Sequence, residues 1–591
     1  MPLKTAVFAQ LLVLHAISLV LATAFLVSPT PTRSSSSSSL SAVAGVPELA
    51  SVASHIEARQ AVEYLRTSLP RPSSPARVIV LGGGLAGLST AKHLVDAGHI
   101  PVVLEARDLL GGKVAAWRDE TGDVSETGLH VFFGAYPNAL TLFDDLGISD
   151  RLQWKSHQML FAKPGRPTRE FAIFDFPPLP APLNAAWAIL TCNGMLTWPE
   201  KIQLGIGLIP AYLQGQAYVD SQEKVTVKEW MEARGIPQSV TDEVFLAMSK
   251  ALGFIGPEQL SMQCVLIALN RFLQESNGSR IAFLDGSPTE RLCEPLKDYI
   301  EARGGVVRTD APVKRILTNE QDSTVAGLLL KGNEVVSGDA YVNAMPVEAL
   351  KKLTPEPWRQ MPYFQRMQKL RGVPVMNVHI WFDRKLSTLD NLIFSRSSIL
   401  SVYADMSETC ADYASNEQSM LELVLAPAAR YMTKSDDEIL SAVMEELELL
   451  FPEEIKADGS SLAQVTKFTV VRTPTSVYES IPGMEAARPD QVSPIENFFC
   501  AGDFSRQKYL ASMEGAILSG KLAAKAVAEW HLQQTSSTKA SIRQLTQRPR
   551  DSHAADANER TPDRTMYVAQ VAREIPREVE AELRATQKPA V

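Results

Sequence analysis

A glycine-rich turn between an apolar strand and a helix constrains the fold more than any other feature of the chain. Residues 78–81 (Val-Ile-Val-Leu) are apolar and rich in β-branched side chains, which is typical of a buried parallel strand. A helical pattern follows over residues 88–95, and a second apolar strand over residues 100–104 ends at an acid, Glu105. These segments predict a complete βαβ unit. The pattern G-x-G-x-x-G between strand and helix is formed by Gly82, Gly84 and Gly87.

The glycines and the acid indicate what this unit binds. The first glycine allows a tight turn, the second lets the backbone approach a pyrophosphate, and the third lets the helix pack closely on the strand. Unpaired N–H groups at a helix N-terminus attract an anion, and Glu105 stands where an acid accepts hydrogen bonds from a ribose. The sequence therefore predicts a dinucleotide site. The alternative is a structural glycine-rich turn without a ligand.

The residues that follow indicate which dinucleotide is bound. Residues 105–113 (Glu-Ala-Arg-Asp-Leu-Leu-Gly-Gly-Lys) resemble the second half of the FAD fingerprint in the flavin amine oxidase and carotenoid desaturase superfamily. Gly111 and Gly112 let the backbone pass close to the cofactor, and Lys113 can face its phosphates. The alternative is a surface loop with a solvated lysine.

A second motif lies some 400 residues later. Residues 497–503 (Asn-Phe-Phe-Cys-Ala-Gly-Asp) form an apolar strand that ends in Ala-Gly-Asp, and a helix rich in small residues starts soon after it. Asp503 can accept hydrogen bonds from a ribityl chain, and N–H groups near Met513 can face a flavin ring. Together with the first motif, this pattern favours FAD over NAD. The sequence holds no second G-x-G-x-x-G, so a separate NAD(P) domain as electron acceptor is not expected.

Composition excludes several other classes of protein. A chain of 591 residues with 45% apolar residues can form two to four domains, or one large enzyme with an inserted domain. The net charge of −9 and the pI of about 5.7 do not favour a nucleic-acid partner. The five cysteines are far apart without a C-x-x-C pair, and the histidines lack ligand spacing. Neither a disulfide framework nor a metal site is expected.

The N-terminus is predicted to be a targeting sequence. Lys4 precedes an apolar run over residues 6–27, which ends near Ala-Thr-Ala-Phe; six serines follow at 34–39, and no acid occurs before Glu48. A signal peptide followed by a Ser-rich, acid-poor transit peptide resembles the bipartite presequences of algae with secondary plastids. A membrane anchor is the alternative, because about 20 apolar residues can span a bilayer. A secretory signal alone is disfavoured, since no disulfide pattern follows.

Residues 174–219 have an unusual apolar character. Short helices there are interrupted by Pro and Gly and carry Trp187, Trp198 and Tyr212 near their ends. None is long enough to span a membrane, and Trp and Tyr favour membrane interfaces. The segment predicts a monotopic membrane surface through which an apolar substrate enters. A buried helical cap over the active site is the alternative.

One charged residue stands out in a helix that is otherwise apolar. Residues 264–273 read Cys-Val-Leu-Ile-Ala-Leu-Asn-Arg-Phe-Leu, with Arg271 near the end. Burying an unpaired charge is costly, so Arg271 either forms a salt bridge within the fold or faces a ligand. The residues alone favour the structural role.

We predict an α/β fold, a Rossmann-like FAD-binding domain of the flavin amine oxidase (GR2) type. It carries an inserted α+β substrate domain and a membrane-facing helical region. The FAD-binding domain comprises residues 77–150, 301–350 and 476–532, the helical region residues 151–300, and the substrate sheet residues 351–475. Flanking segments are a presequence (1–40), a linker with a short helix near 56–69 (41–76), and a mostly disordered tail with a helical pattern at 566–585 (533–591).

Several longer motifs carry a resemblance to one family. They include Phe-Phe-Gly-Ala-Tyr-Pro-Asn (132–138), Leu-Thr-Trp-Pro-Glu-Lys (196–201), Ile-Ala-Leu-Asn-Arg-Phe-Leu-Gln (267–274) and Lys-Tyr-Leu-Ala-Ser-Met-Glu-Gly (508–515). Over residues 77–530 the chain resembles the phytoene desaturases of plants and cyanobacteria. The resemblance implies FAD-dependent removal of hydride from 15-cis-phytoene, twice, through phytofluene to ζ-carotene. A lipid quinone such as plastoquinone fits as acceptor, membrane association is monotopic, and a homo-oligomer is left open.

The same resemblance implies the site residues. Arg271, now a ligand contact rather than a structural ion pair, and Ala511 would meet substrate or quinone. No constellation of acid and base residues stands out, and His130 has the alternative of a satisfied core histidine. The implied FAD contacts are Gly82, Gly84, Ala86, Gly87, Glu105, Ala106, Gly112, Lys113, His130, Val131, Tyr136, Val313 on the adenine side, Asp503 and Met513.

Two other classes of function stay open at this point. A different FAD oxidoreductase, an amine oxidase or a ζ-carotene desaturase, would share the flavin motifs. The apolar segment 174–219 argues against an amine oxidase, which needs a site for a polar amine. A prenyl-protein escort protein would share the fold without redox chemistry, but the full stretch 105–113 and Ala-Gly-Asp at 501–503 favour a bound flavin.

Overall fold

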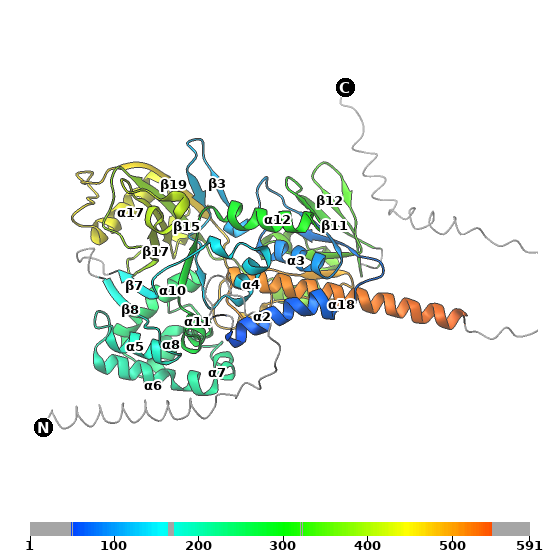
Figure 1. Cartoon of the computed structure of the whole chain (residues 1–591), viewed down its shortest axis with the longest axis horizontal. Helices are drawn as coiled ribbons and strands as arrows, with labels where there is room; N and C mark the ends of the chain where they lie inside the picture. The colour runs from blue at the N-terminus through cyan, green and yellow to red at the C-terminus, as the bar shows by residue number, and fades with distance from the viewer. Residues whose placement is uncertain (1–48, 50, 163–170, 320, 322, 547–591) are drawn as a thin grey trace, which may run out of the picture.

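The computed structural model describes residues 49, 51–162, 171–319, 321 and 323–546. Figure 1 shows these residues in colour. A parallel sheet of five strands, in the order β10-β2-β1-β14-β20, forms the centre of one half of the molecule. Three separate stretches of the chain contribute to it. Its strands are β1 (Arg77–Leu81), β2 (Ile100–Leu104), β10 (Val306–Arg308), β14 (Ala340–Asn343) and β20 (Phe498–Cys500).

Both faces of this sheet are covered, as the continuous apolar character of β1 requires. Val78 and Val80 point into a core with helices on one face, whereas Ile79 and Leu81 point into a second core on the other. The first face carries α3 (Leu85–Asp96), α4 (Pro137–Leu146), α12 (Glu294–Glu301) and α18 (Met513–Thr546). The second carries the antiparallel strands β11 (Val313–Thr318), β12 (Val325–Leu330) and β13 (Val335–Val336), with α13 (Val347–Leu353), α14 (Glu356–Arg359) and α15 (Pro362–Met367).

A seven-stranded mixed sheet, in the order β19-β15-β18-β17-β16-β7-β8, forms the second half of the molecule. Helix α17 (Asp436–Leu450), started by a capping box at Ser435, packs on one face through Ile439, Val443 and Leu447. Its strands are β7 (Gln158–Ala162), β8 (Phe171–Asp175), β15 (Val375–Phe382), β16 (Ile393–Ser395), β17 (Leu400–Asp405), β18 (Met420–Leu425) and β19 (Val465–Thr473).

A group of helices packs on the other face of this sheet. Thr226 caps α8, because its side chain accepts a hydrogen bond from Glu229 N. The helices are α5 (Leu183–Thr191), α6 (Trp198–Gln214), α7 (Gln216–Ser221), α8 (Val227–Ala233), α10 (Leu246–Gly253) and α11 (Met262–Gln274). None of the helices in the described part of the chain combines the length and apolar character needed to cross a bilayer.

Small strands join the two halves. The pair β3 (Ala116–Arg118) and β4 (Val124–Glu126) follows the flavin fingerprint, and β9 (Ile281–Leu284) lies between β5 (Phe132–Phe133) and β6 (Leu152–Trp154). These strands carry the chain from the five-stranded sheet toward the helices and back.

The structure changes two predicted boundaries. The fold begins before residue 77, because helix α2 (Ala53–Glu63) buries His55, Ala58 and Val62 against the rest of the protein. The segment 41–76 is therefore not a simple linker. The last helix, α18, continues to Thr546, beyond residue 533 where the disordered tail was expected to begin. The presequence (1–40) and the helical pattern at 566–585 lie outside the described residues.

Candidate flavin-binding site

The turn after β1 has the geometry that the glycine pattern predicts. Gly82 has a φ of +110°, a region that favours glycine. A Cβ on Gly87 would lie 1.9 Å from the carbonyl oxygen of Gly82, so close packing of α3 on the turn explains this glycine. A Cβ on Gly84 would meet nothing closer than 3.6 Å, at Gly111 O. The packing of the protein therefore does not require Gly84 to lack a side chain, whereas a cofactor lying on the turn would.

Glu105 is fixed beside this turn. Its Oε2 accepts a hydrogen bond of 2.7 Å from Gly83 N, and its Oε1 accepts one of 3.0 Å from Arg107 N. Ala106 follows on the exposed side. The backbone of Glu105 also accepts a hydrogen bond from Ala311 N, which brings the start of β11, with Val313, to the same end of the sheet. The predicted ribose and adenine contacts thus lie together.

The two predicted halves of the flavin site meet across the chain. Lys113 Nζ lies 2.8 Å from Asp503 Oδ2, although 390 positions separate the two residues. Gly111 N donates to Gly83 O at 2.9 Å, so the second fingerprint rests on the first. Both Gly111 and Gly112 have positive φ, +112° and +61°. Lys113 and Asp503 therefore face one location, the end of the parallel strands where an α/β sheet binds its ligands.

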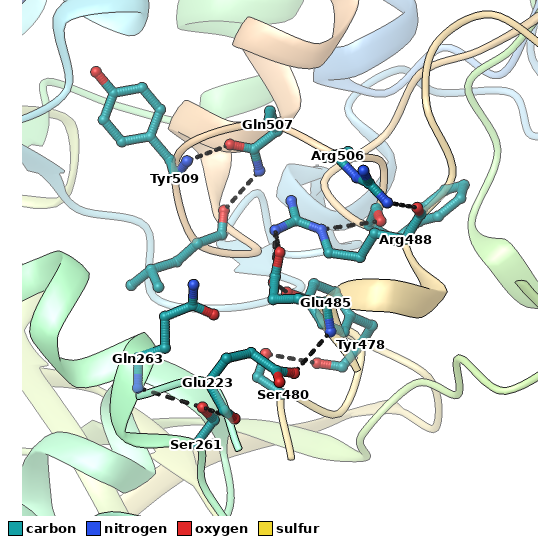
Figure 2. Close-up of polar contacts among 12 residues, drawn as sticks. Glu223, Ser261, Gln263, Tyr478, Ser480, Glu485, Arg488, Arg506, Gln507 and Tyr509 are labelled. Atoms are coloured by element: carbon teal, nitrogen blue, oxygen red, sulfur yellow. Dashed lines mark hydrogen bonds and ion pairs between the residues drawn. The ribbon is translucent and has the colours of Figure 1, made fainter. Parts of the chain in front are cut away.

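The turn that holds Asp503 depends on Arg488, which the sequence did not single out. Arg488 is 2% exposed and donates to both carboxylate oxygens of Glu485, at 2.8 and 3.0 Å (Figure 2). The same guanidinium donates to the carbonyls of Phe504 (3.3 Å) and Ser505 (2.6 Å). It thereby fixes the turn after β20. No local pattern marks this arginine, because its carbonyl partners, Phe504 and Ser505, become neighbours only in the folded protein.

His130 lies in a buried polar network. One ring nitrogen, Nδ1, is 2.9 Å from Glu126 Oε2, and Nε2 is 3.1 Å from Lys113 O. Burial alone would lower the pKa of His130, but the hydrogen bond and charge of Glu126 raise it. Burial, together with the charge of Glu422, raises the pKa of Glu126. Both ring nitrogens have partners within the protein, as in the alternative of a core histidine, so flavin contact by His130 stays a prediction.

The rest of this network was missed, although a signal existed. Asn377 Nδ2 donates to Glu422 Oε1 at 2.5 Å, and His379 Nε2 accepts from Glu126 N at 3.1 Å. Asn377 and His379 occupy alternate positions of the otherwise apolar strand β15, and Glu422 lies opposite His379 on β18. Polar residues at every second position of a buried strand indicate a buried polar face.

Arg271 lies beside the start of α18. Its guanidinium is 2.7 Å from Glu275 Oε1 and donates a 2.8 Å hydrogen bond to the hydroxyl of Tyr509. Burial raises the pKa of Tyr509. The predicted contacts Ala511 and Met513 follow Tyr509 within four positions. Glu275 is the carboxylate that a structural role of Arg271 requires, and Tyr509 is the contact that directs the same side chain toward the site.

A small cavity opens next to this cluster, between α11 and the segment that carries Glu485. Ile267, Ile481, Met484 and Leu510 provide apolar walls, and polar groups such as Gln263 line the remainder. The side chain of Gln507 accepts a hydrogen bond from Tyr509 N (Figure 2) and donates one to Leu510 O. These two hydrogen bonds fix the part of the cavity wall that Leu510 forms. Val131 and Tyr136 are partly buried in the segment between β4 and α4. The ring centroids of Tyr136 and Phe133 lie 5.4 Å apart.

These features fit FAD. The turn offers an anion site at the start of α3, and Gly84 leaves room for the cofactor's pyrophosphate beside the protein backbone. Glu105 and Asp503 supply hydrogen-bond acceptors, and Lys113 supplies a positive charge. Across the described ranges, no group of three or more His, Cys, Asp or Glu is arranged to hold a metal ion. All five cysteines fall within those ranges, and each is a buried free thiol.

Comparison with known proteins identifies the family. The family described as flavin containing amine oxidoreductase matches residues 85–528. The "15-cis-phytoene desaturase, chloroplastic/chromoplastic" of Arabidopsis thaliana is 59% identical over 485 residues, which cover 82% of this chain and 85% of the relative. The "Zeta-carotene desaturase" of Synechocystis is 35% identical over 483 residues, which cover 76% of this chain and 97% of the relative.

A solved structure shows the same fold. An oxidoreductase from Methanosarcina mazei superposes with a TM-score of 0.58 at 14% identity, covering 77% of this chain and all of the other. The comparison confirms the predicted fold class. The chain therefore belongs to the family of flavin-containing amine oxidoreductases, and its cofactor is FAD.

Proposed function

We propose that the chain is an FAD-dependent 15-cis-phytoene desaturase of carotenoid biosynthesis, which converts phytoene through phytofluene to ζ-carotene. The observation that carries the proposal is the difference between two relatives, 59% identity with a 15-cis-phytoene desaturase against 35% with a ζ-carotene desaturase. The long motifs at 132–138, 267–274 and 508–515 support the same choice.

In this proposal, separate groups of residues hold the cofactor and exclude water. FAD held in this site would supply the hydride acceptor for the desaturation of a saturated C–C unit of the substrate. Arg488 and Glu485 hold the turn of Asp503, while Gly84 and the start of α3 receive the phosphates. The apolar walls at Ile267, Ile481 and Leu510 exclude water next to Tyr509.

We infer that the electron acceptor is a lipid quinone, plastoquinone in a plastid. Arg271 and Tyr509 supply hydrogen-bond donors, the kind of group that a quinone oxygen accepts, beside apolar walls that suit its prenyl chain. Ala511, 8% exposed, borders these donors along the chain. Quinone and polyene are both apolar, so one membrane would supply both.

Helices α5 and α6 support membrane association on a single leaflet. Trp187 on α5 is 53% exposed, and Trp198, Ile206 and Leu213 on α6 are 56%, 60% and 62% exposed. The exposed positions 198, 206, 209 and 213 follow helical spacing, on the side of α6 away from its buried residues Leu204 and Ala211. A contiguous exposed apolar surface of this kind favours a membrane or protein partner. Tyr212, which was predicted at this surface, is only partly exposed, whereas its neighbour Leu213, which was not predicted, is 62% exposed.

We propose import into a plastid, reached through a signal peptide followed by a transit peptide. The composition of residues 1–40 supports it, and the Arabidopsis thaliana relative is named chloroplastic/chromoplastic. A reporter fused behind residues 1–50 should reach the plastid of an alga with a complex plastid. Retention of the reporter in the secretory pathway would contradict the proposal.

Incubation with substrate tests the central proposal. The FAD-loaded protein, mixed with liposomes, 15-cis-phytoene and plastoquinone, should produce phytofluene and then ζ-carotene on chromatography, with quinone reduced in proportion. The Gly84→Ala variant, which should lack flavin, serves as control. Consumption of ζ-carotene with phytoene left untouched would assign the chain to the other desaturase class instead.

A further inference from the structure

Helix α2 lies across the flavin-binding half of the protein, although it precedes the first strand of the sheet. It runs along α18 (Figure 1), where Lys521 Nζ donates to Ala58 O at 3.1 Å and to Asn138 Oδ1 of α4 at 2.7 Å. Burial lowers the pKa of Lys521 to about 8, so these contacts hold a largely enclosed amine. Tyr64, just after α2, donates to Glu529 of α18.

One side chain of α2 shares a carboxylate with Arg271. Ser54 Oγ donates to Glu275 Oε1 at 2.9 Å, and the same oxygen lies 2.7 Å from Arg271 Nη2. Glu275 is 7% exposed. Among the residues that the structure describes, neither its Oε2 nor Arg271 Nε has a hydrogen-bond partner. The orientation of the guanidinium therefore depends on a carboxylate that α2 holds from the other side.

Two neighbouring residues of α2 reach the same region. His55 Nε2 donates to Gly134 O at 2.9 Å, two positions before Tyr136. Glu57 accepts two hydrogen bonds, of 2.7 and 2.6 Å, from Lys508, the residue before Tyr509. Burial lowers the pKa of His55 to about 4, so it is neutral at physiological pH and adds no second positive charge beside Arg271. These three contacts come from a single turn of α2, and they end next to Arg271, Tyr509 and Tyr136.

We propose that α2 is a positioning element of the active site, in which Ser54 and Glu57 orient Arg271 and Tyr509 through Glu275 and Lys508. The inference rests on the proposed function, since it takes Arg271 and Tyr509 to meet the quinone or the polyene. It follows that the catalytic unit begins before residue 53, and that a chain started at the glycine fingerprint lacks part of its site.

Point variants test this without removing the helix. Ser54→Ala should raise the KM for plastoquinone about 3- to 10-fold, the effect of one lost hydrogen bond, with flavin content, kcat and melting temperature unchanged. Ser54→Thr keeps the hydroxyl and should restore the wild-type KM. Glu57→Gln should act in the same direction, while Gln60→Ala, an exposed position on the same helix, should change nothing.

A double-mutant cycle and a binding measurement complete the test. Ser54→Ala and Glu275→Gln should be non-additive, because both act through one oxygen. Titration of each flavoprotein with plastoquinone, followed by flavin absorbance, reports binding without turnover. If wild type fails on phytoene but Ser54→Ala still weakens quinone binding, the proposed substrate is wrong and the positioning role holds. Wild-type KM and binding in both Ser54→Ala and Glu57→Gln, or a lower melting temperature as their only change, would overturn the role of α2.

Discussion

The flavin-binding sheet and the helices α5 and α6 use apolar residues in opposite ways. In β1, Val78 and Ile79 are fully buried, each on its own face of the sheet. In α5 and α6, Trp187, Trp198 and Leu213 are more than half exposed, although neighbouring positions such as Leu204 are buried. Burial explains the first set as core. The second set is mostly outside the core, which supports the proposed contact with a membrane.

The largest expected effect concerns the sheet. Gly87→Ala places a Cβ 1.9 Å from Gly82 O, and relieving that clash requires a backbone shift that costs at least about 2–3 kcal/mol. The variant should lose both stability and flavin. Gly84→Ala, where the closest atom is 3.6 Å away, should keep its melting temperature as apoprotein but lose flavin. Thermal unfolding and flavin release on heating measure the two effects. Equal flavin loss and equal destabilisation in both variants would mean that Gly84 serves packing as well.

The next effect concerns the exposed helices. Trp187→Gln and Trp198→Gln should each weaken liposome binding about 10- to 100-fold, because a buried aromatic side chain contributes about 1.5–3 kcal/mol. Melting temperature and flavin content should stay unchanged, since both side chains are more than half exposed. Leu462→Gln, at a 61% exposed position before β19, is the matched control and should leave binding unchanged. Sedimentation with liposomes checks this. Wild-type binding by the double tryptophan variant would assign α5 and α6 to a protein partner or a cap.

The next effect concerns Arg271, a charged residue in a helix that is mostly apolar. We expect Arg271→Ser to fold, to keep FAD, and to change the KM for quinone about 10-fold through the lost contact with Tyr509. The cost in stability should stay below the 3–5 kcal/mol of a fully buried pair, because Ser54 still donates to Glu275. Steady-state kinetics measure the change in KM, and thermal unfolding measures the loss of stability. A variant that loses its flavin or does not fold would make Arg271 structural.

The sequence predicted local constraints well and tertiary ones poorly. The constraint on the glycine turn is local. Gly82 is required by its own positive φ, and Gly87 by its close contact with Gly82, five positions earlier. The motifs that contain Lys113 and Asp503 were each predicted to contact the cofactor, but the direct contact between the two side chains was not predicted. Arg488 could not be found in the same way, since its acceptors on Glu485 and Ser505 come together only when the turn after β20 folds.

The helix near residues 56–69 was predicted, but its burial against the rest of the protein was not, for a similar reason. Its buried face consists of His55, Ala58 and Val62, a spacing that suits a helix but a composition too weakly apolar to predict burial. The partners that bury it, α4 and α18, lie far along the chain. Exposed Trp187 and Trp198, in contrast, were predicted from composition, because aromatic side chains on short apolar helices interrupted by Pro and Gly are typical of a membrane interface.

The smallest expected effect is a loss of stability in acid. It depends on buried histidines, which are more numerous in the flavin-binding half than around the seven-stranded sheet. Burial lowers the pKa of His55, His99 and His157 to about 4, and that of His93 well below its usual value. Above pH 6.5 these residues are neutral in both states and have no effect. Below it the unfolded chain takes up protons that the folded chain refuses, so stability falls as pH drops from about 6.5 to about 4.

Three of these four histidines, His55, His93 and His99, belong to α2, α3 and the start of β2 in the flavin-binding half. Acid should therefore release flavin before it disrupts the seven-stranded sheet. Each group contributes a slope of at most about 1.4 kcal/mol per pH unit. His130 opposes the trend only in the range where Glu126 keeps it charged. In His99→Asn, an amide oxygen can still accept from Ala76 N, so the fold should survive and the slope of unfolding free energy between pH 6.5 and 4.5 should decrease by about one proton. Urea unfolding at several pH values measures that slope, and an unchanged slope would show that His99 is already protonated in the folded protein.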